Sequence, residues 1–192
     1  MDKISRKSIS LPTLIETLQE ICIRETKEEL IFSANIYEGQ DARMVSYKKY
    51  SSHETWVYDF PEMEIRTFYN QKYFKVKHPS SFIKIKVRNG RIDEMLIYPY
   101  KKNEGLETKL LDNPFPNGYD SNSTCMGSAD RKTAGDNIKA IIGILETPYT
   151  HATTGFIGNE LKATEAAFQY LQDNQFPYDR IKATNKKLSE IL

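Results

Sequence analysis

Eight residues, Ser81–Arg88, alternate between apolar and basic side chains and run directly into Asn89-Gly90. The apolar positions are Ile83, Ile85 and Val87, and the basic ones are Lys84, Lys86 and Arg88. Successive side chains of a strand point to opposite faces, so the pattern predicts a strand with one buried and one basic face. Asn-Gly favours a two-residue hairpin turn, which makes Arg91–Tyr98 the returning strand. The chain is therefore expected to contain an antiparallel sheet.

The basic face of this strand has two interpretations. It is either a solvated outer face that also discourages pairing between sheet edges, or a docking patch for an acidic partner protein. The sequence leaves both open.

The other predicted elements come from the same kind of pattern. Further short strands are expected at 30–32, 56–58, 65–69 and 73–76, and helices at 10–25, 136–146, 160–173 and 181–192. Asp136 is the expected N-cap of the second helix, which Pro148 ends. Strands that run together with helices at the ends predict an α+β fold. We expect one domain over 1–192, with a helical segment at 1–28, a meander sheet at 29–100, a loop at 101–135 and helices at 136–192.

Composition excludes several classes of protein. The 27 basic and 26 acidic side chains give a net charge of +1, which argues against non-specific nucleic-acid binding. No apolar run approaches the roughly 20 residues that span a bilayer, and no apolar signal core follows the basic N-terminus, so we expect a cytoplasmic protein without a membrane partner. Two cysteines and three histidines, none at metal-ligand spacing, argue against a structural zinc site.

The second notable feature is a loop built almost wholly of turn residues that leads to Cys125. Asn117 precedes this cysteine by eight positions. A polar loop that presents a thiol beside an amide suits thiol chemistry. Cys22 lies instead on the apolar stripe of the first predicted helix, as a small buried hydrophobe. A Cys22–Cys125 disulfide is disfavoured in a reducing compartment.

The loop resembles the active-site loop of the ubiquitin-conjugating enzyme superfamily. That family pattern is His-Pro-Asn, seven residues and the catalytic Cys, and this chain has Phe115-Pro116-Asn117, seven residues and Cys125. The sequence is more similar to bacterial members, prokaryotic family D and the PRTRC-system protein B group. Those proteins also lack the leading His. The matching segments are Pro114 to Tyr119, Cys125-Met126-Gly127 and Thr150-His151-Ala152.

The resemblance implies a ubiquitin-conjugating-like fold and a transferase. Cys125 would accept a ubiquitin-like modifier as a thioester from an adenylating activating enzyme and pass it to an amine on a target protein. A deconjugating metalloprotease is a further implied partner, and antiphage defence or a mobile element is the implied bacterial context. Neither a cofactor nor nucleic acid is implied.

Several residues are candidates for supporting roles. Asn117 either donates to the oxyanion formed during amine attack or hydrogen-bonds its own loop. Gly127 either admits the modifier's tail or satisfies an unusual backbone angle. Asp130 or Asp120 would orient or deprotonate the incoming lysine. His151 and Tyr119 complete the candidate site.

Two other functions compete with transfer. A catalytically inactive ubiquitin-conjugating-like module would only dock a partner, since a fold does not fix a function. A cysteine hydrolase would use Cys125 and His151, and would need a base within hydrogen-bond reach of the thiol.

Overall fold

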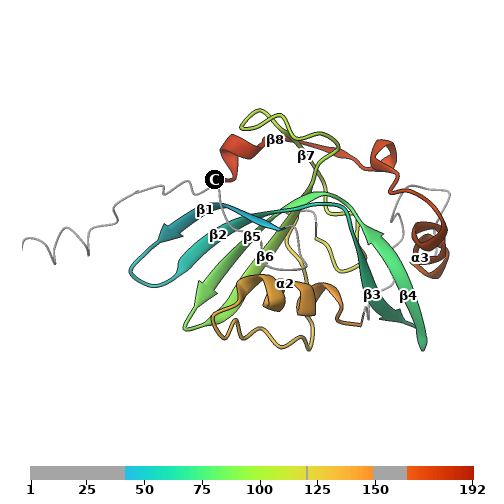
Figure 1. Ribbon diagram of the computed structural model, residues 1–192, viewed down its shortest axis with the longest axis horizontal. Helices are drawn as coiled ribbons and strands as arrows, with labels where there is room; N and C mark the ends of the chain where they lie inside the picture. Colours follow the sequence, from blue (N-terminus) through green and yellow to red (C-terminus); the bar gives the residue numbers. More distant parts are fainter. Residues whose placement is uncertain (1–41, 120, 149–163) are drawn as a thin grey trace, which may run out of the picture.

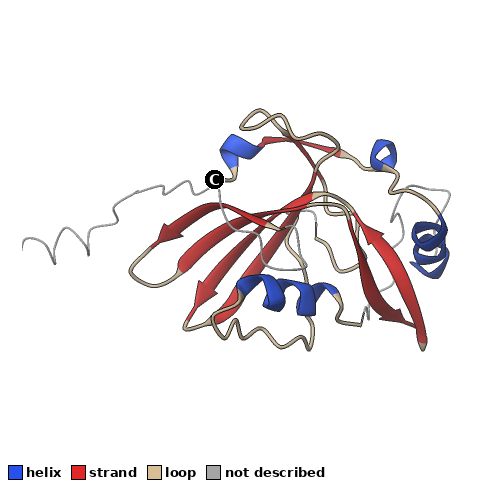
Figure 2. Cartoon of the chain, viewed as in Figure 1, coloured by secondary structure: helices blue, strands red, loops and turns tan. Residues whose placement is uncertain are grey.

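The computed structural model describes residues 42–119, 121–148 and 164–192, and these form an α+β structure (Figures 1 and 2). The strands are β1 (Arg43–Lys49), β2 (Glu54–Phe60), β3 (Met63–Tyr69), β4 (Lys72–His78), β5 (Ser81–Arg88), β6 (Arg91–Pro99), β7 (Lys109–Leu111) and β8 (Ala183–Lys187). The helices are α2 (Asn137–Leu145) and α3 (Thr164–Asp173), with short 3-10 turns η1 (Tyr178–Arg180) and η2 (Leu188–Glu190). The helix predicted at 10–25 and the strand predicted at 30–32 lie outside the described residues.

The main sheet has four antiparallel strands in the order β1-β2-β5-β6. The predicted β5–β6 hairpin is confirmed, and β5 has the expected bounds. Both turn residues have positive φ, +50° at Asn89 and +68° at Gly90, as a tight hairpin turn of this kind requires. Ile83, Ile85 and Val87 are buried as the alternation predicts.

Strands β3 and β4 do not belong to this sheet, which corrects the expectation of a single meander. They pair only with each other and form a separate two-stranded ribbon between β2 and β5 in the sequence. Pro61 and Pro79 flank the ribbon. Because proline has no N–H to donate, it ends a ladder of hydrogen bonds, and β2 pairs with β5 instead.

The main sheet is covered on both faces (Figure 1). On one face its buried side chains pack with α2, through residues that include Ile141 and Ile144. The same core continues to α3, which packs on β4 of the ribbon through Phe168 and Phe74. The opposite face packs with the β7–β8 pair and η2, through Val57, Phe82, Tyr98, Leu110, Leu188 and Ile191.

The predicted cap of α2 is confirmed, because Asp136 Oδ1 accepts from the backbone N–H of Lys139 at 2.9 Å. None of the described helices is long and apolar enough to cross a membrane.

The helix predicted over 181–192 is wrong. This segment is β8 followed by η2, and β8 pairs with β7 inside the region expected to be loop. Leu188 and Ile191 are buried against the sheet, so tertiary packing decides the conformation.

The same segment, residues 183–192, covers part of the basic face of β5. Lys84 Nζ donates to the carbonyl of Ile191 at 2.7 Å, and burial lowers the pKa of Lys84. The interpretation of that whole face as solvated is therefore wrong at Lys84.

Candidate functional site

The loop that carries Cys125 is a tight hairpin. The backbone N–H of Cys125 donates to the carbonyl of Asn117 at 2.8 Å, and that of Tyr119 donates to Ser123 at 2.9 Å. Gly118 pairs with Thr124 between these two bonds. The eight-residue spacing of Asn117 and Cys125 thus places them opposite each other across the two arms of the hairpin.

The second arm of this hairpin is fixed to the outer edge of β6. The N–H of Thr124 donates to Met95 at 2.8 Å, and the N–H of Ile97 donates to Asn122 at 3.0 Å. Ser123 and Leu96 form the bridge between these bonds. The hairpin therefore covers part of an edge that would otherwise expose unpaired backbone groups, and it places Cys125 beside β6.

Asn122 is the main anchor of the hairpin, and sequence reasoning gave it no role. Its side chain is buried and donates to the carbonyls of Ile97 at 2.8 Å and Leu111 at 2.9 Å. Its φ of +64° lies in the left-handed region, which asparagine tolerates better than most residues. The sequence does show that Asn122 is a polar turn residue three positions before a cysteine. The two carbonyls that its side chain bonds lie far away in the sequence, so the sequence does not reveal its role as an anchor.

Cys125 is a half-buried, free thiol. The neighbouring Cys125 side chain raises the pKa of Tyr119, through hydrogen bonding and through charge. Tyr119 itself is 58% exposed. The structure thus brings together two of the predicted site residues, Tyr119 and Cys125.

The Asn117 side chain is turned toward its own loop. Its Nδ2 donates to the carbonyl of Cys125 at 3.2 Å, and its Oδ1 is buried with no hydrogen-bond partner among the described residues. This geometry supports the interpretation of Asn117 as a structural residue of the loop. A role toward an oxyanion would require Nδ2 to leave the Cys125 carbonyl.

The base of the hairpin is packed tightly. A Cβ on Gly118 would lie 2.8 Å from Asn113 Cγ and 3.0 Å from the Phe115 carbonyl, so any larger residue would have to displace its neighbours. Phe115 is buried, and its ring stacks on His78 with centroids 4.9 Å apart. The position that is histidine in the general family pattern is here an aromatic residue of the core.

The remaining predicted residues are less closely tied to the thiol. Gly127 has φ +48°, and a Cβ added there would meet no described atom within 4 Å, which fits the backbone-angle interpretation. Asp130 is exposed, and its Oδ1 accepts from the N–H of Lys132 at 3.1 Å, as a turn aspartate commonly does. Asp120 and His151 lie outside the described residues, so the hydrolase hypothesis stays a prediction.

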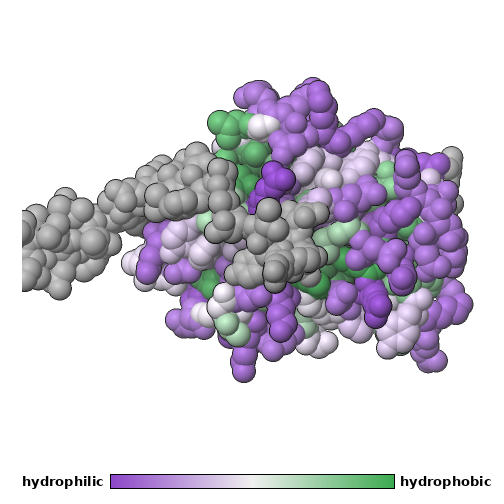
Figure 3. Space-filling model, in the orientation of Figure 1, coloured by the Kyte–Doolittle hydropathy of each residue, from purple (hydrophilic) through white to green (hydrophobic). Residues whose placement is uncertain are grey.

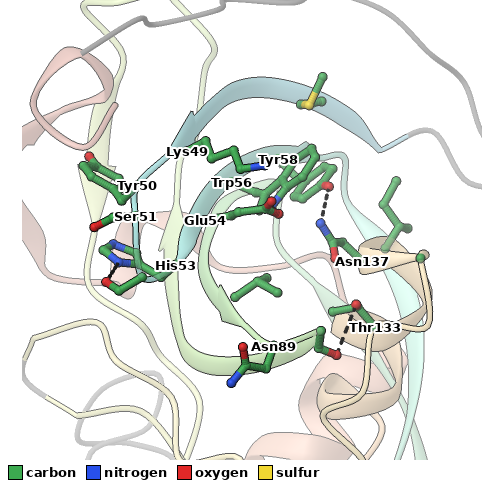
Figure 4. A pocket seen from close by; sticks show the side chains of 16 residues that line it. Lys49, Tyr50, Ser51, His53, Glu54, Trp56, Tyr58, Asn89, Thr133 and Asn137 are labelled. Carbon is green, nitrogen blue, oxygen red and sulfur yellow. Dashed lines mark hydrogen bonds between the residues drawn. The ribbon is translucent and has the colours of Figure 1, made fainter. Parts of the chain in front are cut away.

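A large cleft lies elsewhere on the molecule (Figure 4). Its volume is about 620 Å³, and its lining comes from β1, β2, the β5–β6 turn and the start of α2. Trp56 and Tyr58 form its aromatic wall, and Asn137 Nδ2 donates to the Tyr58 hydroxyl at 3.0 Å. Cys125 lies beside β6, at the opposite edge of the sheet from β1. Cys125 does not line this cleft.

The part of the chain that the structure describes contains no group of three or more histidine, cysteine, aspartate or glutamate side chains placed to hold a metal ion. No family model, curated protein or solved structure matches the chain.

Proposed function

We propose that this protein is a ubiquitin-conjugating-like transferase with Cys125 as its nucleophile. The observation that carries the proposal is the position of the free thiol. Cys125 is half-buried, opposite Asn117 in a hairpin fixed to the last strand of an antiparallel sheet, and α2 begins at Asn137, soon after it in the sequence. This order of sheet, asparagine, cysteine and helix is the order that the resemblance of the loop implies.

The chemistry proceeds in two exchanges. The Cys125 thiolate attacks the carbonyl carbon of a modifier held as a thioester on the activating enzyme. A new C–S bond forms, the old one breaks, and the activating enzyme's thiol leaves. An amine of the target then attacks the new thioester, a C–N bond forms, and the Cys125 sulfur leaves. The amine proton passes to solvent or to a base on the target.

In the proposed mechanism, Asn117 and Tyr119 hold the Cys125 sulfur in position. Asn117 holds the Cys125 carbonyl, and the backbone N–H of Cys125 holds the Asn117 carbonyl, so the residue is fixed from two sides. Tyr119 lies beside the Cys125 side chain, which raises the pKa of its hydroxyl. Both are positioning residues, since neither needs to exchange a proton with the substrate.

The occupied amide of Asn117 also favours a second function, an inactive docking module. If Nδ2 stays on the Cys125 carbonyl, no donor of this side chain is aimed at a developing oxyanion. In that case the fold would bind a modifier or its partner without forming a thioester.

A loading assay separates the two functions. Wild type, Cys125→Ser and Cys125→Ala are incubated with the cognate activating enzyme, the modifier and ATP. Transfer predicts a thiol-sensitive adduct on wild type, a thiol-resistant oxyester on the serine variant and no adduct on the alanine variant. Modifier binding without any adduct would instead support the docking module.

A further inference from the structure

The outward face of the β3–β4 ribbon combines exposed aromatic and basic side chains. The register places Glu64 opposite Lys77, Arg66 opposite Lys75 and Phe68 opposite Tyr73 on one face. Tyr73 is 82% exposed, and its ring lies 4.9 Å from that of Phe68. We call these six residues the ribbon strip. In Figure 1 the ribbon extends away from the main sheet, with α3 beside it, and the surface over both is mostly hydrophilic in Figure 3.

The charges of the strip are not balanced within the described part of the molecule. Arg66 and Lys75 are directly opposite each other, and like charges in such a pair destabilise a sheet. Glu64 lies 3.2 Å from Lys75 Nζ and offsets part of this repulsion. Among the described residues, Arg66 has no hydrogen-bond or ion-pair partner. Three cations against one carboxylate leave an excess of positive charge beside two aromatic rings.

A cleft of about 710 Å³ adjoins the strip. Arg66, Phe68, Tyr73 and Lys75 line it from the ribbon, together with the buried-face residues Thr67 and Phe74. Glu146, Pro148 and Gln172 line it from the ends of α2 and α3. The site thus offers cations, aromatic surface and a hollow in one place, which are the features of a protein-docking surface.

We propose that the ribbon strip docks an acidic segment of a partner protein that carries an apolar side chain. The partner's carboxylates would pair with Arg66 and Lys75, and its apolar side chain would contact Phe68 and Tyr73. Single-stranded nucleic acid also uses cations and aromatic rings. Here the carboxylates of Glu64 and Glu146 lie on the same surface, and the chain's net charge is only +1. Nucleic acid carries a negative charge at every nucleotide, whereas a peptide can place its carboxylates against Arg66 and Lys75 and away from Glu64 and Glu146, so acidic protein is the better complement.

The test uses a fluorescein-labelled peptide in which glutamates alternate with leucine and phenylalanine, followed by fluorescence anisotropy. We compare wild type, Arg66→Glu/Lys75→Glu and Tyr73→Ser with the control Lys109→Glu/Lys139→Glu. The control makes the same change in net charge at exposed sites on β7 and α2. Thermal unfolding of each variant shows that it is folded, and Tyr73→Ser alters a side chain that is 82% exposed.

Wild type should bind the peptide less tightly as salt rises, and a lysine-containing version of the peptide should not bind. The double reversal on the ribbon should weaken binding by about tenfold or more, Tyr73→Ser should also weaken it, and the control should not. Equal losses in ribbon and control variants, or no binding by wild type, would overturn the proposal. Tighter binding of an oligothymidine through Arg66 and Lys75 would replace the acidic protein by nucleic acid.

Discussion

The imidazole of His78 lies flat against the phenyl ring of Phe115, with centroids 4.9 Å apart and planes 9° apart. His78 ends β4, and Phe115 begins the hairpin that carries Cys125, so this contact joins the ribbon to the thiol loop. His78 is fully buried. Its Nδ1 lies 3.0 Å from the Pro79 carbonyl, and its Nε2 has no partner among the described residues.

The burial of His78 predicts a loss of stability in mild acid. Burial lowers its pKa from 6.5 to about 4, so the unfolded chain takes up the proton first. The contribution of the neutral His78 side chain to the free energy of unfolding is complete above pH 6.5 and is lost as the pH falls toward 4. Between about pH 7 and about pH 5 the free energy of unfolding should fall by about 2 kcal/mol from this residue. Urea unfolding of wild type, His78→Phe and His53→Gln measures it.

This fall in the free energy of unfolding should disappear in His78→Phe. It should persist in His53→Gln, which removes a histidine outside the core. An unchanged slope in His78→Phe would show that His78 does not stay neutral in the folded protein.

Gly118 and Gly143 are a matched pair of glycines for testing the packing of the hairpin. Gly118→Ala should cost about 1–3 kcal/mol, because the new Cβ meets Asn113 and the Phe115 carbonyl. Gly143 is exposed in α2, and a Cβ added there meets no described atom within 4 Å, so Gly143→Ala should stabilise by about 0.5–1 kcal/mol. Thermal unfolding compares them, and equal shifts of the same sign would refute the close approach at Gly118.

Asn122 supports the hairpin in two ways, through its side-chain hydrogen bonds and through a backbone with positive φ, and two substitutions separate them. Asn122→Ala removes the donors to Ile97 and Leu111 and forces alanine to φ +64°, so we expect a loss of about 2–4 kcal/mol. Asn122→Gly keeps the backbone angle and should recover about 1 kcal/mol of that loss. Denaturant unfolding measures both. If the glycine variant were as stable as wild type, the side-chain bonds would contribute nothing.

Asn117 should behave as a positioning residue. Asn117→Ala removes the bond to the Cys125 carbonyl and should lower the free energy of unfolding by about 1 kcal/mol. Loading of Cys125 and discharge to an amine should slow by similar factors, since both depend on the position of the sulfur. Unchanged stability with a discharge rate lower by about 100-fold or more would assign Asn117 to the oxyanion.

Local signals predict the central part of this fold well. The alternation of Ser81–Arg88, the Asn-Gly turn and the Asp136 cap each act within a few residues, and all three are confirmed. The pairing of β7 with β8 joins distant parts of the sequence, with Lys109 opposite Lys187, and β7 has only three residues. No local pattern predicts such a contact, which is why the apolar spacing of 181–192 predicts a helix that does not form.

The candidate site, too, has one part that local sequence predicts and another that depends on contacts between distant parts of the chain. The spacing of Asn117 and Cys125 correctly places the two residues together, because a tight hairpin is a local structure. The anchors of that hairpin are not local. Asn122 bonds to β6 and β7, and Phe115 packs on His78 of the ribbon, which only the folded chain brings together.

The most direct test of the proposed transfer is to locate the modifier on the chain. Wild type is incubated with activating enzyme, modifier and ATP, digested under non-reducing acidic conditions and analysed by peptide mass spectrometry. The account predicts that the modifier's C-terminal residues are attached to the Cys125 peptide and are released by a reducing thiol. Attachment only to a lysine, or no attachment while the activating enzyme itself is charged, would contradict it.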